Sequence, residues 1–314
     1  MTLPPLPIRW PAESIWQAVS PQLPGFTVEV LPEIDSSNTE LLRRIKSGRP
    51  EPTLLVAEQQ TAGRGRLGRQ WHSQRGDSLT FSLGLALQPV DWSGLSLAVG
   101  ISLADSLDPA LAADTRIGPH TGLHIGLKWP NDLWLCSPEG ERKLAGILVE
   151  TASWEGLRHV VIGVGINVSA DALVGVTDAS GAPSGTLASP VVPPMPPAAL
   201  QELVPGIDVA GALLRVVAPL VQTVQAFAQF GFSPFQARFA RRDVLAGRNV
   251  TVFEGKNRLE GSAHGVGANG ALLVHTADGM KEITSSEVSV RPLPMRAAPG
   301  NNSAPSQRQD MPPC

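Results

Sequence analysis

The chain is 314 residues long, which gives room for a buried core and for two domains. Apolar residues make up 42% and charged residues 17%, a composition typical of globular proteins that excludes an intrinsically disordered chain. The formal net charge of −3 gives no electrostatic attraction for nucleic acid, so we expect no nucleic-acid partner.

The cysteines and the first residues of the chain indicate the cellular compartment of the protein. Cys136 and Cys314 are far apart and have no C-x-x-C partner, which excludes a disulfide framework and a thiolate zinc cluster. The first fourteen residues lack the continuous apolar core of a signal peptide, and no apolar run approaches the ~20 residues of a membrane span. We expect a soluble cytoplasmic protein without a membrane partner.

Apolar periodicity predicts alternating strands and helices over the first 168 residues. The predicted helices lie at 12–19, 35–48 and 95–107, and the predicted strands at 26–31, 53–59, 78–87, 123–135, 143–153 and 159–168. In the second helix, Ser37 and Glu40 have the S-x-x-E spacing of a capping box. A further helix is predicted at 208–230, with a kink at Pro219.

The composition changes after this first part. Residues 169–206 are rich in Ala, Pro, Gly and Ser without any period, and we interpret them as a long, partly mobile insertion. Short strands with Gly and Asn turns predict a small all-β module at 241–293. The tail at 294–314 is polar and proline-rich, so we expect disorder there. Residues 1–240 would then form the first domain.

The stretch TAGRGRLGR, residues 61–69, contains the G-x-G-x-x-G pattern of dinucleotide-binding loops. Its context argues against that function, because no helix pattern follows the glycines. The expected ribose-binding acid is also missing, since Asp77 comes too early and Asp91 too late. A kinase loop is excluded as well, because neither H-R-D nor D-F-G follows.

The arginines of this stretch support another interpretation. Glycines at 63, 65 and 68 allow the backbone to fold tightly around a ligand. Guanidinium groups at 64, 66 and 69 suit carboxylate or phosphate oxygens, which they bind through paired, charge-assisted hydrogen bonds. The loop therefore favours a substrate with several anions, such as a carboxylate beside an ATP triphosphate. The alternative is a solvated turn with surface arginines.

Two other motifs lack their necessary context. Residues 76–79 spell the G-D-S-L signature of some esterases, but no histidine has an aspartate three residues before it. His120 and His124 are four residues apart, but Pro119 and Gly122 are incompatible with a shared helix face for metal binding.

Five motifs in fixed order resemble the biotin protein ligases (biotin–carboxyl-carrier-protein ligases) along about 30–170. They are EIDSSNTELL, AEQQTAGRGRLGRQW, LKWPNDL, RKLAGILVE and VVIGVGINV, and the end of the chain, GSAHGVGANGALLV, resembles that family's small β-barrel. The resemblance implies an α+β fold, with a catalytic domain similar to class II aminoacyl-tRNA synthetases followed by an SH3-like barrel.

The resemblance also implies roles for individual residues. Those implied to bind biotin are Ser36, Ser37, Asn38, Gln60, Arg64, Gly65, Arg66 and Lys143. Those implied to bind ATP or the adenylate are Arg64, Arg66, Arg69, Trp71, Lys128, Asn131 and Asn167, with Asp132 near a metal. Lys143, Arg66 and Arg64 would be catalytic. The alternatives are helix capping for Ser37, a core position for Trp71 and a solvated surface position for Lys143.

The implied function is ATP-dependent ligation. Mg²⁺ and ATP would activate the biotin carboxylate as biotinyl-5′-AMP, which then reacts with a lysine of a biotin carboxyl carrier protein. A lipoate or octanoate ligase or transferase of the same fold is the alternative, and a non-enzymatic binding module is a further one.

Only 34 residues precede Asp35, too few for a helix-turn-helix domain, so we expect no repressor function. Dimers are frequent in the family, which makes a homodimer one expectation. Glycine content and like-charge crowding predict a mobile loop before ligands bind.

Overall fold

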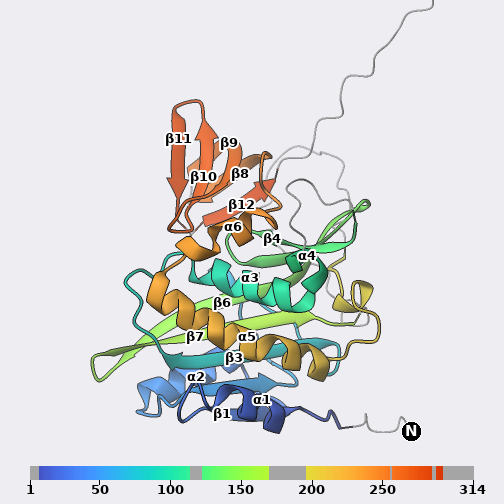
Figure 1. The fold of residues 1–314 in the computed structure, drawn as a ribbon, viewed down its shortest axis with the longest axis vertical. Helices are drawn as coiled ribbons and strands as arrows, with labels where there is room; N and C mark the ends of the chain where they lie inside the picture. Colours follow the sequence, from blue (N-terminus) through green and yellow to red (C-terminus); the bar gives the residue numbers. More distant parts are fainter. Residues whose placement is uncertain (1–6, 114–121, 170–195, 255–256, 285–287, 293–314) are drawn as a thin grey trace, which may run out of the picture.

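The structure of the protein is a computed structural model that describes residues 7–113, 122–169, 196–254, 257–284 and 288–292. Its first domain is built on a seven-stranded sheet in the order β1-β2-β3-β7-β6-β5-β4 (Figure 1). The strands are β1 Thr27–Leu31, β2 Thr53–Ala57, β3 Ser78–Ala86, β4 His124–Lys128, β5 Asp132–Ser137, β6 Gly140–Trp154 and β7 Leu157–Asn167. Only β1 and β2 pair in parallel, and the other neighbours are antiparallel. The predicted α+β class is confirmed.

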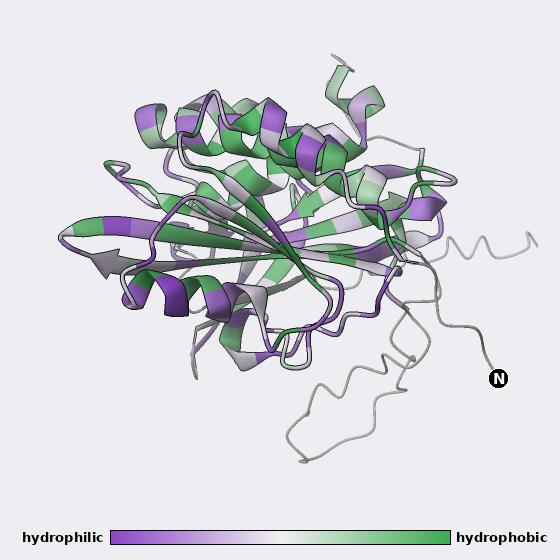
Figure 2. Cartoon of the chain, turned by 90° about the horizontal axis from the view of Figure 1, so that it is seen from below, coloured by the Kyte–Doolittle hydropathy of each residue, from purple (hydrophilic) through white to green (hydrophobic). Residues whose placement is uncertain are grey.

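Helices cover both faces of this sheet. They are α1 Ala12–Val19, α2 Ser37–Lys46, α3 Leu95–Leu107, α4 Pro109–Ala113, α5 Val209–Phe230 and α6 Gln236–Ala240. Short 3-10 turns lie at Arg66–Gly68, Leu200–Glu202 and Ser233–Phe235. Helices α3 and α5 contact each other and one face of the sheet, while α2 lies on the opposite face (Figures 1 and 2).

The alternation of side chains along β3 separates the hydrophobic core from the polar face. Leu79, Phe81 and Leu83 are buried within the main hydrophobic cluster, which includes residues of α3 and α5. Thr80 and Ser82 point the other way and are equally buried. A buried face made of small polar groups is unusual in a core, and it marks the α2 side of the sheet as the place for a polar site.

Helix α5 is the one described helix that is long and apolar enough to cross a membrane. It packs against α1, α3 and β3, and ten of its residues are buried, Val216 and Leu220 among them. That burial is characteristic of the core helix of a globular domain. The helix continues through Pro219 as one element.

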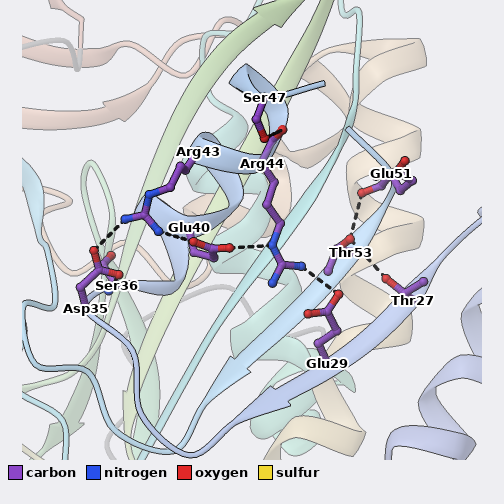
Figure 3. Close-up of polar contacts among 10 residues, drawn as sticks. All are labelled: Thr27, Glu29, Asp35, Ser36, Glu40, Arg43, Arg44, Ser47, Glu51 and Thr53. Carbon is purple, nitrogen blue, oxygen red and sulfur yellow. Dashed lines mark hydrogen bonds and ion pairs between the residues drawn. The ribbon is translucent and has the colours of Figure 1, made fainter. Parts of the chain in front are cut away.

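The start of α2 corrects the predicted capping box. The N-cap is Ser36, whose side chain accepts a hydrogen bond from the Thr39 amide, whereas Ser37 is already inside the helix. Glu40 does not reach back to the cap but pairs with Arg43 and Arg44 on the next turn (Figure 3). The hydroxyl of Ser37 is thereby available for other contacts.

The predicted extent of the insertion is too long at its C-terminal end. Residues 196–206 are part of the folded domain: Ala198, Ala199 and Leu200 are fully buried, and Ala198 N–H donates to the carbonyl of Lys143 at 2.8 Å. Apolar residues without a period can pack as an irregular segment, which periodicity does not detect. Residues 170–195 of the predicted insertion and the tail 294–314 lie outside the described residues.

The second domain is a five-stranded antiparallel sheet in the order β11-β10-β9-β8-β12. Its strands are β8 Asn249–Glu254, β9 Asn257–Val266, β10 Leu272–Thr276, β11 Gly279–Ile283 and β12 Val288–Pro292. The turn between β9 and β10 reaches the first domain, where the buried indole of Trp129 donates to the carbonyl of Gly270 at 3.0 Å.

Candidate active site

Three glycines, Gly146, Gly163 and Gly165, form a part of the sheet without side chains on the α2 side, here called the glycine floor. Gly146 and Gly165 are direct partners on β6 and β7. A Cβ at Gly163 would overlap the amide of Asn38, and one at Gly165 would overlap the indole of Trp71. Gly163 and Gly165 are therefore required so that these two side chains can lie directly on the sheet.

A chain of hydrogen bonds among Gln60, Ser37, Ser82 and Asn38, here called the polar network, borders the glycine floor. The Gln60 side-chain oxygen accepts from both the amide and the hydroxyl of Ser37, at 2.8 and 3.1 Å. Ser82 lies 2.7 Å from the Ser37 hydroxyl and donates to Asn38 Oδ1 at 2.6 Å. Because Ser37, Asn38 and Ser82 are all buried, these bonds fix one orientation for each polar group.

The glycine- and arginine-rich stretch forms a narrow two-stranded loop, residues 63–71, here called the tongue. Trp71 N–H donates to the Gly63 carbonyl at 2.9 Å, and Gly65 N–H donates to the Arg69 carbonyl at 2.8 Å. The chain reverses at Leu67, which has a φ of 56° and is about half exposed. A branched side chain in the left-handed region is strained, a condition that concentrates at binding loops.

The three arginines of the tongue point to different surroundings. Arg64 forms an ion pair with Glu150 of β6, with Nη2 2.8 Å from Oε1, and also donates to Thr39 at 3.3 Å. Arg66 donates to Asn131 Oδ1 at 3.3 Å. Burial lowers the pKa of Arg66 below its ordinary value, a nearby Asp132 raises it, and Arg69 lowers it.

Lys143 and Asp132 face each other across β5 and β6. The ammonium of Lys143 lies 2.9 Å from Asp132 Oδ1 and 5.9 Å from the centre of the Trp71 ring. Asp132 thus serves as counterion for Lys143 and stabilises the charge of Arg66. Cationic side chains gathered at one place favour an anionic ligand.

The turn at Lys128–Asp132 is held by contacts with α3 and with β6. The Trp129–Pro130 peptide bond is cis, and the Pro130 carbonyl accepts from Ser96 of α3 at 2.8 Å. The Asn131 side chain donates to the carbonyl of Ile147 on β6, also at 2.8 Å. These contacts place Asn131 where Arg66 of the tongue reaches it.

A hollow of about 610 Å³ lies between the tongue, β6 and this turn. It is lined by Ala62, Gly63, Arg64, Gly65, Arg66, Leu67, Gly68, Arg69, Gln70, Ser96, Pro130, Ile147, Leu148 and Val149. Its volume is in the range of small-molecule sites. Arg64, Gly65, Arg66 and Arg69, which the sequence predicts as ligand contacts, are among the lining residues.

The other residues singled out in the sequence divide into two groups. Those at the polar network, the glycine floor or the turn are Ser37, Asn38, Gln60, Trp71, Asn131, Asp132 and Lys143. Ser36, Lys128 and Asn167 have other surroundings. Ser36 caps α2, Lys128 lies over the ring of Trp134 at 4.9 Å, and Asn167 ends β7 opposite Ser78. The ligand contacts expected of all these residues stay predictions.

Ser82 and Glu150 belong to the site but were missed in the sequence. Ser82 lies in a predicted strand, where the alternation of polar and apolar residues assigns it to the face opposite Phe81. Glu150 ends the motif RKLAGILVE, and nothing in that motif alone indicates a partner. Only the fold brings it to Arg64, which is 86 residues away in the chain.

The donor set does not form a metal site of its own. Within the described residues no three His, Cys, Asp or Glu side chains come together. Asp132 is a single carboxylate already paired with Lys143. Mg²⁺ commonly binds through one or two carboxylates together with substrate phosphates, so Asp132 fits only a Mg²⁺ that arrives with ATP.

Two family models match this chain. The Biotin/lipoate A/B protein ligase family matches residues 30–167, which contain the tongue, the polar network and the glycine floor. The Biotin protein ligase C terminal domain matches residues 246–291, which contain the second sheet.

Known proteins show the same similarity. The bifunctional ligase/repressor BirA of Escherichia coli (strain K12) is 34% identical over 276 residues, 86% of this chain and 76% of that protein. The biotin–[acetyl-CoA-carboxylase] ligase of Paracoccus denitrificans is 29% identical, over 82% of this chain and 98% of its own length. The solved structure of the biotin protein ligase from Aquifex aeolicus in complex with biotin and ATP superimposes with a TM-score of 0.62. It is 28% identical and covers 85% of this chain and 99% of its own.

Proposed function

We propose that this chain, which belongs to the biotin protein ligase family, activates biotin with ATP and transfers the biotinyl group to a protein lysine. The observation that carries the proposal is the set of cationic side chains gathered around the hollow. Arg64, Arg66 and Arg69 line it, and Lys143 lies beside Gly146 of the glycine floor. This arrangement suits a ligand pair that brings two anions, the carboxylate of biotin and the phosphates of ATP.

Activation needs these two anions in contact. A carboxylate oxygen of biotin attacks the α-phosphorus of ATP, the bond to the bridging oxygen breaks, and pyrophosphate leaves. Fixed cations promote this step by placing the reactants and by stabilising the negative charge that grows at phosphorus. In our assignment Lys143 contacts the biotin carboxylate and the α-phosphate, and Arg66 contacts the phosphates. No nucleophile of the protein is required.

The polar network is assigned to the neutral end of biotin. The ureido ring has both donors and a carbonyl acceptor, and Ser37, Asn38 and Gln60 carry both kinds of group in fixed positions. A site built for such hydrogen bonds rejects an acid that lacks the ring, because its buried polar groups would then be unpaired. The hydrogen-bonding groups of the polar network therefore favour biotin over lipoate or octanoate.

The tongue is assigned to protection of the adenylate. Biotinyl-5′-AMP is a mixed anhydride that water would hydrolyse, so a closed cover extends its lifetime. Gly65 and Gly68 allow the backbone of the tongue to approach a ligand closely. Trp71, at the base of the tongue, is assigned to the adenine side, and Arg69 gives additional support to the phosphates.

Transfer follows from the chemistry of the anhydride. The amine of the acceptor lysine attacks the acyl carbon, AMP leaves with the electron pair, and the amine loses a proton. The acceptor we propose is the carrier domain of a biotin-dependent carboxylase, since two relatives are named biotin–[acetyl-CoA-carboxylase] ligases. Mg²⁺ bound to ATP would reduce the charge of the phosphates, with Asp132 as the nearest protein carboxylate. We place the reaction in the cytoplasm, in keeping with a buried, reduced Cys136.

The proposal is tested by ATP–pyrophosphate exchange with one of three acids, biotin, lipoate or octanoate. Exchange that depends on biotin, with at least a hundredfold lower activity for the two fatty acids, is the expected result. Preference for lipoate or octanoate would assign the chain to the lipoate branch of the fold. Exchange with none of them would leave a binding protein.

A further inference from the structure

Glu150 of β6 lies where the tongue meets the polar network. Its Oε1 accepts from Arg64 Nη2 at 2.8 Å, and its Oε2 accepts from Asn38 Nδ2 at 3.0 Å. The carboxylate therefore connects a residue of α2 and a residue of the tongue, to which the Arg64–Thr39 hydrogen bond adds a second connection. The reaction described above gives Glu150 no role.

The surroundings of Glu150 distinguish it from an ordinary surface ion pair. The Glu150 side chain is 22% exposed, and its Oε2 accepts from Asn38 Nδ2 and also from Arg64 Nη1, the latter at 3.4 Å. Asn38 Nδ2 also donates to the carbonyl of Leu148, and its Oδ1 accepts from Ser82. One carboxylate thus completes a continuous path of hydrogen bonds, from Gln60 at the base of the tongue back to Arg64 within it.

A second pair in the same region provides a comparison. Arg44 and Glu29 also meet at 2.8 Å, but they lie on α2 and β1, away from the glycine floor (Figure 3). Ion pairs near the surface contribute little to stability, commonly below about 1 kcal/mol. An Arg–Glu ion pair of the same length therefore occurs once beside the candidate site and once away from it.

We infer that Glu150 is a positioning residue for biotin binding, which holds Arg64 of the tongue and Asn38 of the polar network in one arrangement. The inference rests on the proposed function, since it names what organises that site. Glu150 does not touch the substrate; it acts through its two partners. With the carboxylate in place, both partners are oriented before biotin arrives, and less ordering is required on binding.

The effect of replacing Glu150 follows from this arrangement. Glu150→Ala leaves Arg64 without its carboxylate and Asn38 with one acceptor fewer, so the KM for biotin is expected to rise about tenfold. The kcat is expected to change by less than about threefold, because an orienting contact is equally present in the ground state and the transition state. Glu150→Gln keeps an acceptor for Arg64 and should give an intermediate KM.

The decisive experiment is a double-mutant cycle of Arg64→Ala and Glu150→Ala, with biotin-dependent pyrophosphate exchange as the readout. Because Glu150 acts in part through Arg64, the rise of the KM for biotin in the double variant should be clearly smaller than the product of the two single effects. Glu29→Gln is the matched control and should equal the wild type. Multiplied effects of the two substitutions, or a wild-type KM for Glu150→Ala, would overturn the inference.

A second measurement is independent of activity. Trypsin cleavage after Arg66 and Arg69 in the protein without ligands reports how often the tongue opens. Glu150→Ala should be cleaved several times faster than both the wild type and Glu29→Gln, and equal rates for all three would contradict the inference. Absence of exchange in the wild-type protein would remove the proposed function, and the cleavage rates alone would then decide whether Glu150 holds the tongue.

Discussion

At the scale of residues, a few side chains with shared partners account for the chemistry. Asp132 pairs with Lys143 at 2.9 Å and also stabilises the charge of Arg66. Anionic ligands bound between these cations would add further charge-assisted hydrogen bonds.

The direct consequence concerns Lys143. Lys143→Ala removes the cation assigned to the biotin carboxylate and the α-phosphate, and the rate of adenylation should fall on the order of 10²–10³-fold. The variant should fold, since the Lys143 side chain is 41% exposed. Single-turnover formation of biotinyl-5′-AMP measures the effect. Lys46→Ala, at the exposed end of α2, is the control; near-normal adenylation by Lys143→Ala would remove the role assigned to Lys143.

The glycine floor makes a second prediction at this scale. Gly165→Ala introduces a methyl group where the Trp71 indole lies, so the indole must leave its place on the sheet. We expect the affinity for ATP to decrease at least about tenfold, because Trp71 is assigned to the adenine side, and isothermal titration calorimetry measures this directly. Gly122→Ala, where a Cβ would meet nothing, is the control. Unchanged affinity for ATP in Gly165→Ala would show that the indole does not border the adenine site.

The sequence predicted single residues unevenly. It identified Ser37, Asn38 and Gln60, which the fold joins in one network, but it assigned the cap of α2 to Ser37 instead of Ser36. Both serines have a hydroxyl that can cap, and only the backbone geometry decides between them. Glu150 could not be found, because its partners depend on the order of the strands.

At the scale of elements, the tongue and the connection between the domains are the informative segments. The sequence recognised the tongue as a loop for anions, and its arginines do surround a hollow. It did not predict the return of residues 196–206 to the strand that carries Lys143, since an irregular packed segment has no period.

The connection before β8 contains a titrating group in an unusual position. Asp243 pairs with Leu127 in a short bridge beside β4, and its Oδ2 is buried without a partner. Burial raises the pKa of Asp243 to about 6, although the Leu245 amide bonded to its other oxygen lowers it. The folded protein therefore binds a proton at this carboxyl more strongly than the unfolded chain does.

The raised pKa of Asp243 makes the stability of the folded protein depend on pH. The unfolded pKa is about 4, so the protonated carboxyl costs nothing below that pH, and stability is lost as the pH rises from about 4 to 6. Above pH 6 the loss is complete. The difference in free energy of unfolding between wild type and Asp243→Asn should shift by about 2–3 kcal/mol across this window, in favour of the variant at high pH. Denaturant titrations from pH 4 to 8 measure this difference in free energy of unfolding. A difference that does not change with pH would show that the Asp243 carboxyl is not destabilised by burial when it is charged.

At the scale of the whole molecule, the two domains are joined through buried contacts. Trp129, beside the turn that carries Asn131, donates to the Gly270 carbonyl in the second sheet. Gly270 lies close to the start of α3, since a Cβ there would come within 2.7 Å of Gly94 Cα. The second sheet therefore supports the turn at the hollow as well as forming a domain of its own.

Trp129→Phe tests this joint. Phenylalanine keeps an aromatic ring, although a smaller one, but loses the N–H donor, which leaves the Gly270 carbonyl without its partner and should cost about 1–3 kcal/mol of stability. Trp134→Phe is the matched control, because the indole nitrogen of Trp134 is buried without a partner and its removal costs no hydrogen bond. Thermal and denaturant unfolding compare the two. Equal stability of both variants would show that the contact does not hold the domains together.

The sequence predicted the class of the fold better than its assembly. Alternating and periodic apolar residues were sufficient for most strands and helices, and the order of five motifs was sufficient for the family. The order of the strands and the contact between Trp129 and Gly270 depend on interactions between distant residues, which no local pattern contains.

The central claim is that this chain attaches biotin to a carrier protein through an adenylate made at the tongue. The most direct measurement is the mass of a biotin carboxyl carrier domain after incubation with the wild-type protein, biotin and ATP. We predict the addition of one biotinyl group at one lysine, dependent on ATP and absent from a carrier with that lysine replaced by arginine. An unmodified carrier, or the same modification with octanoate in place of biotin, would contradict the account.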